Sequence, residues 1–387
     1  MSLHLSILAL MTFPKSNPQP FYFKLAMVLI GIIALGYLSI LGKEVLCPLL
    51  FGLLFSILLL PLANFFENRL KLHRNTASAL SVLLLLLSVT AVILVVGSQV
   101  SSLSHDLPML KQQIVASLHN LSEWISSKFH VNIEKQMNYV NSATSKIETM
   151  APTVIGATVL SVSSILLFIV FVMFDTFFLL FYRKLLLKFL VDVFRERNAE
   201  AVYDIVARVQ LIIRKYIVGL FLEMGTVAVV CCSVFLLLGI KYAILLGLIT
   251  ALFNIIPYIG IFTALFLNIL ITFATTGAAT KVLLVVITVV SMHLVDSNIL
   301  LPLIVGSKVR INAFITLLGV VVGEMIWGIP GMFLSIPVIA ITKIIFDRIE
   351  ELQPWGNLLG DEKISSKSLR LNTKIRKQKT DKYTKSS

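Results

Sequence analysis

The sequence predicts an all-α membrane protein that crosses the bilayer several times. Of its 387 residues, 57% are hydrophobic and only 14% are charged, whereas soluble domains carry about a quarter charged residues. Mean hydropathy is +0.93. Apolar stretches of roughly 20 residues, enough to cross a hydrocarbon core of about 30 Å, recur between residues 22 and 346. In lipid each span must pair its own backbone groups, so spans rich in Leu, Ile, Val and Phe are helices.

We expect about 8 transmembrane segments, two of them broken or re-entrant. They lie at 22–41, 45–64, 77–100, 153–181, 216–239, 242–276, 281–305 and 311–346. The sixth and the eighth are too long for one crossing, and they contain the breaks NIIPYIG and WGIPG. Each is therefore either two short crossings or a re-entrant pair of half-helices. The first three segments form one unit at 22–100, and the last four form a C-terminal core with broken helices at 216–346.

Four other regions are not spans. Residues 101–152 repeat apolar positions at helical spacing, which predicts an insert of amphipathic helices outside the cytoplasm. Residues 182–215 form a basic amphipathic stretch that we expect along the inner membrane surface. Residues 1–21 are an N-terminal tail, and 347–387 are a basic cytoplasmic tail.

The positive charge predicts orientation rather than nucleic-acid binding. The net charge is +13, but Lys and Arg gather in the final residues and in every second short loop. Cytoplasmic loops carry such an excess of Lys and Arg, and basic tails are attracted to anionic lipid. We therefore expect a multi-pass protein of the cytoplasmic membrane with both termini in the cytoplasm, in contact with membrane lipid and not with nucleic acid.

The sequence offers no sign of an enzyme. It contains no Walker loop, no GxGxxG, no HExxH and no Cys/His spacing suited to a metal. Its cysteines, Cys47, Cys231 and Cys232, all lie in apolar runs and are interpreted as core residues. We expect no cofactor and no metal site.

Ionisable residues inside the spans are the candidates for function, because they are costly there and usually face a bundle interior or a wet cavity. Asp296 and Asn298 lie in SMHLVDSNILLPLIVG, Glu223 in LFLEMGTV and Glu324 in VVGEMIWG. Their hard oxygens suit a small cation or a proton, so a proton or sodium is the expected coupling ion. Glu324 is either a second coupling carboxylate or the structural partner of an amide. His293 either shares a proton with Asp296, three residues on, or is satisfied by a neighbouring helix.

Proline and glycine interrupt these spans beside the polar residues. Pro302 has no N–H, which leaves the carbonyl of Asn298 without its helical partner. Pro257 does the same to the carbonyl before Asn254, and Gly260 lets the chain turn. The remaining break residues are Gly306, Gly328, Pro330, Gly331 and Pro337. Spans interrupted by Gly and Pro are the best sequence indicator of a transporter's binding site.

These motifs together resemble the autoinducer-2 exporter (AI-2E) family of bacterial transporters. The similarity lies in a linked series of motifs over about 240–360: NIIPYIG, LVDSNILLPLIVGSKVRINAF and WGIPGMFLSIPVIAITKIIFDRIEELQPWGNLLG. The rest of the chain is similar in layout. The resemblance implies a helical, homo-oligomeric permease of the bacterial inner membrane. Its motif residues carry over to Asn254, Pro257, Gly260, Asp296, Asn298, Pro302, Gly306, Gly328, Gly331 and Pro337.

The resemblance and the residues favour a secondary transporter that exports a small polar solute, such as the signalling molecule autoinducer-2, coupled to an ion gradient. The side chains available to hydrogen-bond an organic solute are few: Asn254, Tyr258, Asn268 and Trp327. Two alternatives stay open. One is a sodium(lithium)/proton antiporter, which needs little more than carboxylates and other oxygens to bind a monovalent cation. The other is a scaffold without transport activity that acts through residues 101–152.

Overall fold

The computed structural model describes residues 20–105, 112, 116, 163–194, 199–256, 259–300 and 311–360. Within these ranges the chain is helical, and the one β-bridge joins Ile311 to Gly360. Seven described helices are long and apolar enough to span a membrane, and three apolar helices are shorter. The all-α polytopic fold is therefore confirmed.

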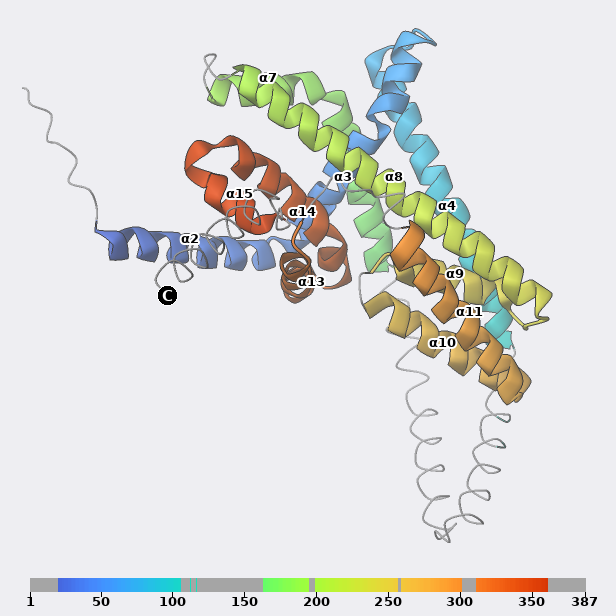
Figure 1. The fold of residues 1–387 in the computed structure, drawn as a ribbon. Helices are drawn as coiled ribbons and strands as arrows, with labels where there is room; N and C mark the ends of the chain where they lie inside the picture. The colour runs from blue at the N-terminus through green and yellow to red at the C-terminus, as the bar shows by residue number, and fades with distance from the viewer. Residues whose placement is uncertain are drawn as a thin grey trace, which may run out of the picture.

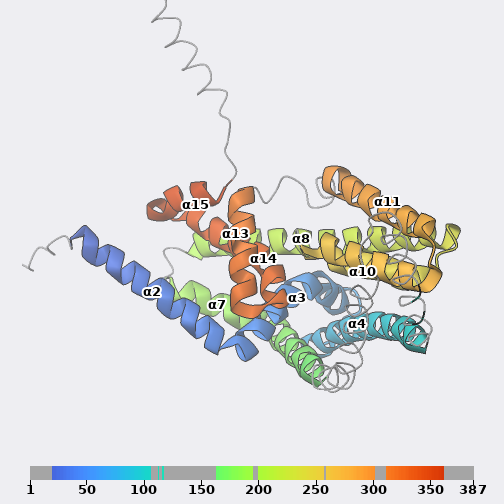
Figure 2. The ribbon, with the colours of Figure 1, turned by 90° about the horizontal axis from the view of Figure 1, so that it is seen from below.

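The first helices follow the predicted spans. They are α2 (Phe21–Leu41), α3 (Lys43–Asn68), α4 (Arg74–His105) and the helix Ser163–Phe181. The last three pack together through Leu59 and Ala63 of α3, Leu85 of α4 and Leu180. Helix α2 instead projects from the rest of the molecule with most of its apolar side chains exposed (Figures 1 and 2). An exposed face of this composition suits contact with lipid.

The longest helix differs from the predicted boundary at residue 215. After α7 (Arg183–Val193), α8 (Ala199–Leu237) runs through 39 residues without a break, a length of about 58 Å at 1.5 Å per residue. No Pro or Gly stands between Ala199 and Ile217, so nothing ends the helix where the basic stretch becomes apolar. Helix α8 consequently belongs to two cores, one with α3 and α14 and the other with α9 and α11.

Both long segments are broken where the sequence predicts. The sixth consists of α9 (Ala243–Asn254) and α10 (Ile259–Thr276), and the eighth of α13 (Ala313–Trp327) and α14 (Ile329–Arg348). Between them, α11 (Ala279–Val295) continues into a π-helical turn, Asp296–Leu300. Figure 1 shows α9, α10 and α11 grouped along the second half of α8, while α13 and α14 lie near its first half.

The hairpin of α13 and α14 turns on glycines. Gly328 has φ +68° and ψ −144°, a conformation that side chains with a Cβ rarely adopt. A Cβ on Gly331 would overlap the carbonyl oxygen of Gly323, so the two helices touch there. Pro330 stands in the first turn of α14, where its missing N–H costs nothing. The prediction that Pro337 also breaks this segment is wrong: α14 continues through Pro337, because one lost hydrogen bond is tolerated in a helix held by its neighbours.

Residues after α14 also fold, although the sequence assigns 347–387 to a tail. A 3₁₀ turn (Glu350–Leu352) and α15 (Gln353–Leu359) pack against α14. The Asn312 N–H donates to the carbonyl of Leu359 at 3.0 Å, which ties α15 to the start of α13. Several predictions lie outside the described residues: most of the insert at 101–152, residues 1–19 and 361–387, and Pro257, Pro302 and Gly306.

Candidate functional site

The side-chain amide of Asn254 lies between two buried carboxyl groups in the region where α8 packs against α9 and α11. The Asn254 amide donates to Oε1 of Glu223 at 2.9 Å and to Oδ2 of Asp296 at 3.1 Å. Glu223 is 4% exposed and Asp296 is 6% exposed. The structure thus brings together three sequence candidates from three different helical segments. We call these residues the carboxylate cluster.

Local helix geometry places each member of the cluster. Asn254 is the last residue of α9, and Asp296 is the first residue of the π-helical turn that follows α11. Such π-helical turns occur frequently at functional sites. Gly260, at the start of α10, lies directly against the carbonyl of Phe253, where a Cβ would overlap the oxygen. This close approach holds the end of α9 beside the beginning of α10.

Two carboxyl oxygens of the cluster make no hydrogen bond within the described chain. Oε2 of Glu223 and Oδ1 of Asp296 are buried, and neither has a hydrogen-bond partner within the described chain. A carboxylate taken out of water needs a donor or a cation to offset the loss of hydration. The arrangement can therefore hold a proton or a monovalent cation beside the shared amide.

A second group of polar side chains continues from the cluster between α9 and α10. The Asn268 amide donates to Oγ1 of Thr250 at 2.7 Å, and this hydroxyl donates to the carbonyl of Leu246 at 2.8 Å. Thr250 precedes Asn254 by one helical turn, and Thr272 follows Asn268 by one turn, so the pairs share helix faces. Oδ1 of Asn268 and Oγ1 of Thr272 are buried without a partner among the described residues. We call Thr250, Asn268 and Thr272 the polar seam.

Sequence reasoning named Asn268 as a contact for an organic solute but missed Thr250 and Thr272. The four-residue spacing of Thr250 from Asn254, and of Thr272 from Asn268, was the available signal. Of the other solute candidates, Tyr258 lies outside the described ranges. Trp327 donates from Nε1 to the carbonyl of Ser39 at 2.8 Å, which joins the tip of the α13–α14 hairpin to α2.

Three other candidates do not join the cluster. Asn298 is exposed and its amide donates back to the carbonyl of Leu294 at 2.8 Å, so it does not face Asp296. Nε2 of His293 lies 3.4 Å from Oγ of Ser297, and its buried Nδ1 has no partner within the described chain. Glu324 is exposed on α13, which packs on α14, α2 and α3 rather than on α8 to α11.

Comparison with known proteins decides the family. The model of the AI-2E family transporter matches residues 23–351. The chain belongs to the AI-2E transporter family. Its relatives include "Putative transport protein YueF" of Bacillus subtilis, 27% identical over 79% of this chain and 84% of the relative. "AI-2 transport protein TqsA" of Escherichia coli is 23% identical over 85% of this chain and 95% of the relative.

The family confirms the resemblance drawn from the motifs and shows a multi-pass membrane transporter. Transport is thus the activity in which the carboxylate cluster and the polar seam are expected to act. The family is one of transporters rather than enzymes.

Proposed function

We propose that this AI-2E transporter is an inner-membrane secondary permease that exports a small polar solute, coupled to a proton or sodium ion bound at the carboxylate cluster. The proposal rests on the Asn254 amide, which donates to both Glu223 and Asp296. Each of these carboxyl groups has one buried oxygen without a partner in the described chain. Buried carboxylates of this kind in membrane segments serve ion pathways and proton relays.

The geometry supports a coupling in which binding or release of the ion at the carboxylate cluster changes the conformation of the transporter. With a proton or a cation present, the two carboxyl groups can share one amide at close range. When that ion leaves, two like charges remain in an apolar bundle, and their repulsion favours a state in which the cluster is open to water. The cluster joins α8, the end of α9 and the end of α11, and the break between α9 and α10 lies next to it. Binding and release therefore act where the helices are already interrupted.

The polar seam supports a solute pathway beside the ion. Asn268 and Thr272 are fully buried and offer an amide oxygen and a hydroxyl with no partner among the described residues. A small hydroxylated solute could satisfy both groups. Autoinducer-2 is our leading candidate, because the relative TqsA is named an AI-2 transport protein.

A second candidate is sodium(lithium)/proton exchange. It is favoured by the chemistry of the unpartnered atoms, because those of Glu223, Asp296, Asn268 and Thr272 are all oxygens. Oxygen ligands suit hard monovalent cations.

Flux measurements on the purified chain in proteoliposomes test both functions. We expect autoinducer-2 or another small polar solute to move against its gradient only when a proton or sodium gradient is imposed. Exchange of sodium or lithium for protons without solute movement would favour the antiporter instead. No flux of solute or cation across the screened set would overturn transport and favour a scaffold that acts through residues 101–152.

The orientation is a separate prediction. Reporters after Lys184 and at Ser387 should give cytoplasmic signals and one near Ser126 an external signal, because basic loops stay in the cytoplasm. Fusions to an enzyme active on only one side of the membrane measure this. A cytoplasmic signal near Ser126 would contradict the orientation.

A further inference from the structure

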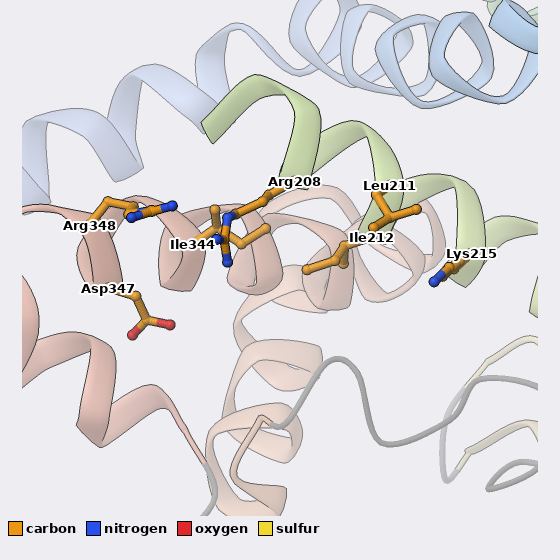
Figure 3. Close-up of a pocket in the computed structure, with 7 residues that line it drawn as sticks. All are labelled: Arg208, Leu211, Ile212, Lys215, Ile344, Asp347 and Arg348. Carbon is orange, nitrogen blue, oxygen red and sulfur yellow. The ribbon is translucent and has the colours of Figure 1, made fainter. Parts of the chain in front are cut away.

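We propose that a pocket between α8 and α14 binds the phosphate headgroup of an anionic phospholipid. The pocket has a volume of about 480 Å³, and its lining residues on α8, from Arg208 to Lys215, precede Glu223 of the carboxylate cluster on the same helix. Figure 3 shows Arg208 and Lys215 on α8 and Arg348 at the end of α14 as its cationic lining. The inference does not depend on the proposed coupling mechanism.

The pocket carries more positive than negative charge. Both guanidinium groups pair with one carboxylate, that of Asp204: Arg208 Nε lies 3.1 Å from both oxygens, and Arg348 contacts the second of them. Asp347 forms an ion pair with Lys343, whose Nζ lies 2.6 Å from Oδ2 of Asp347. Because one carboxylate serves two guanidinium groups, and each guanidinium has five N–H donors, both arginines keep donors for an added anion. Their side chains are 57% and 42% exposed, so an anion can reach them.

The apolar part of the lining separates a lipid from a free anion. Leu211 and Ile212 of α8 and Ile344 of α14 line the same pocket. They stand where the basic first part of α8 gives way to its apolar run and where α14 leaves its own apolar run. A phosphate ion would contact only the cations, whereas a phospholipid can place its phosphate on the arginines and its acyl chain on the aliphatic side chains.

The predicted orientation puts this pocket at the membrane surface that attracts basic groups to anionic lipid. Basic pockets between helices on the cytoplasmic side are known to hold anionic headgroups. Guanidinium groups suit this role because their planar donors match phosphate oxygens in pairs.

Binding to the full-length chain in a neutral detergent tests the proposal. The probes are short-chain phosphatidylglycerol, phosphatidylcholine with the same acyl chains, and glycerol 3-phosphate. We expect phosphatidylglycerol to bind and to raise the Tm, and the other two to do neither. The double variant Arg208→Gln/Arg348→Gln should bind phosphatidylglycerol about ten-fold or more weakly, since it loses charge-assisted hydrogen bonds.

Two further variants keep the test interpretable. Lys188→Gln removes one exposed positive charge from α7, outside the pocket, and should bind as the unchanged protein does. Lys215→Gln leaves Arg208, Arg348 and Asp204 in place, and it should weaken binding even if the double variant folds poorly. Equal binding of phosphatidylcholine would show a purely apolar groove, and equal binding of glycerol 3-phosphate a site for soluble anions. Either result, or unchanged affinity in Lys215→Gln and the double variant, would overturn the proposal.

Discussion

Asp296→Asn is expected to leave the protein folded and inserted while lowering gradient-driven transport by about ten-fold or more. Asparagine keeps the size and the hydrogen-bonding capacity of the side chain but removes its charge and its exchangeable acidic proton. A hydrogen bond to a charged group contributes about 1.5–3 kcal/mol, which corresponds to a factor of ten or more. Glu223→Gln should have the same effect, because the Asn254 amide bonds both carboxyl groups. Flux in proteoliposomes at several pH values measures both the rate and the loss of its pH dependence.

Glu324→Gln is the matched control for these two substitutions. It removes a carboxylate from another apolar segment, but Glu324 is exposed on α13 and lies outside the cluster. We expect transport to be largely retained. Normal pH-dependent flux in both cluster variants, or its loss only in Glu324→Gln, would contradict coupling at Glu223 and Asp296.

The membrane spans and their breaks could be predicted from general properties of lipid, proline and glycine. Lipid forces long apolar segments into helices, and Pro and Gly mark where such helices end. The uninterrupted α8 shows the limit of this reasoning. Hydropathy changes near residue 215, but helix geometry does not depend on hydropathy, and no residue there ends the helix.

The residues of the carboxylate cluster could be named from the sequence, but the contacts between them could not be predicted. Asn254 is 31 residues from Glu223 and 42 from Asp296, so their contacts depend on how α8, α9 and α11 pack. Asn298 does not join Asp296 in the cluster for a local reason. Residues two apart on a helix point to different sides, and Asp296 instead continues the buried face of α11 formed by Val289 and Met292. That spacing was visible in the sequence.

Gly260→Ala should destabilise the transporter and reduce its flux together. A methyl group at Gly260 would overlap the carbonyl oxygen of Phe253, which is backbone and cannot rotate away. The start of α10 must then move from the end of α9, where Asn254 bridges the two carboxyl groups. Overpacking of this kind costs about 1–3 kcal/mol. Thermal unfolding of the purified protein and flux in proteoliposomes measure the two effects.

Gly225→Ala provides the comparison that separates the contact at residue 260 from a general effect of replacing glycine. Gly225 lies two residues from Glu223 on α8, and a Cβ there meets no atom within 4 Å. Alanine in an open helical position stabilises a helix by about 0.5–1 kcal/mol relative to glycine. We therefore expect an equal or higher Tm and unchanged flux. If Gly260→Ala behaved like Gly225→Ala in both measurements, α9 and α10 could separate at the break without cost, and their close approach would not hold Asn254 in the carboxylate cluster.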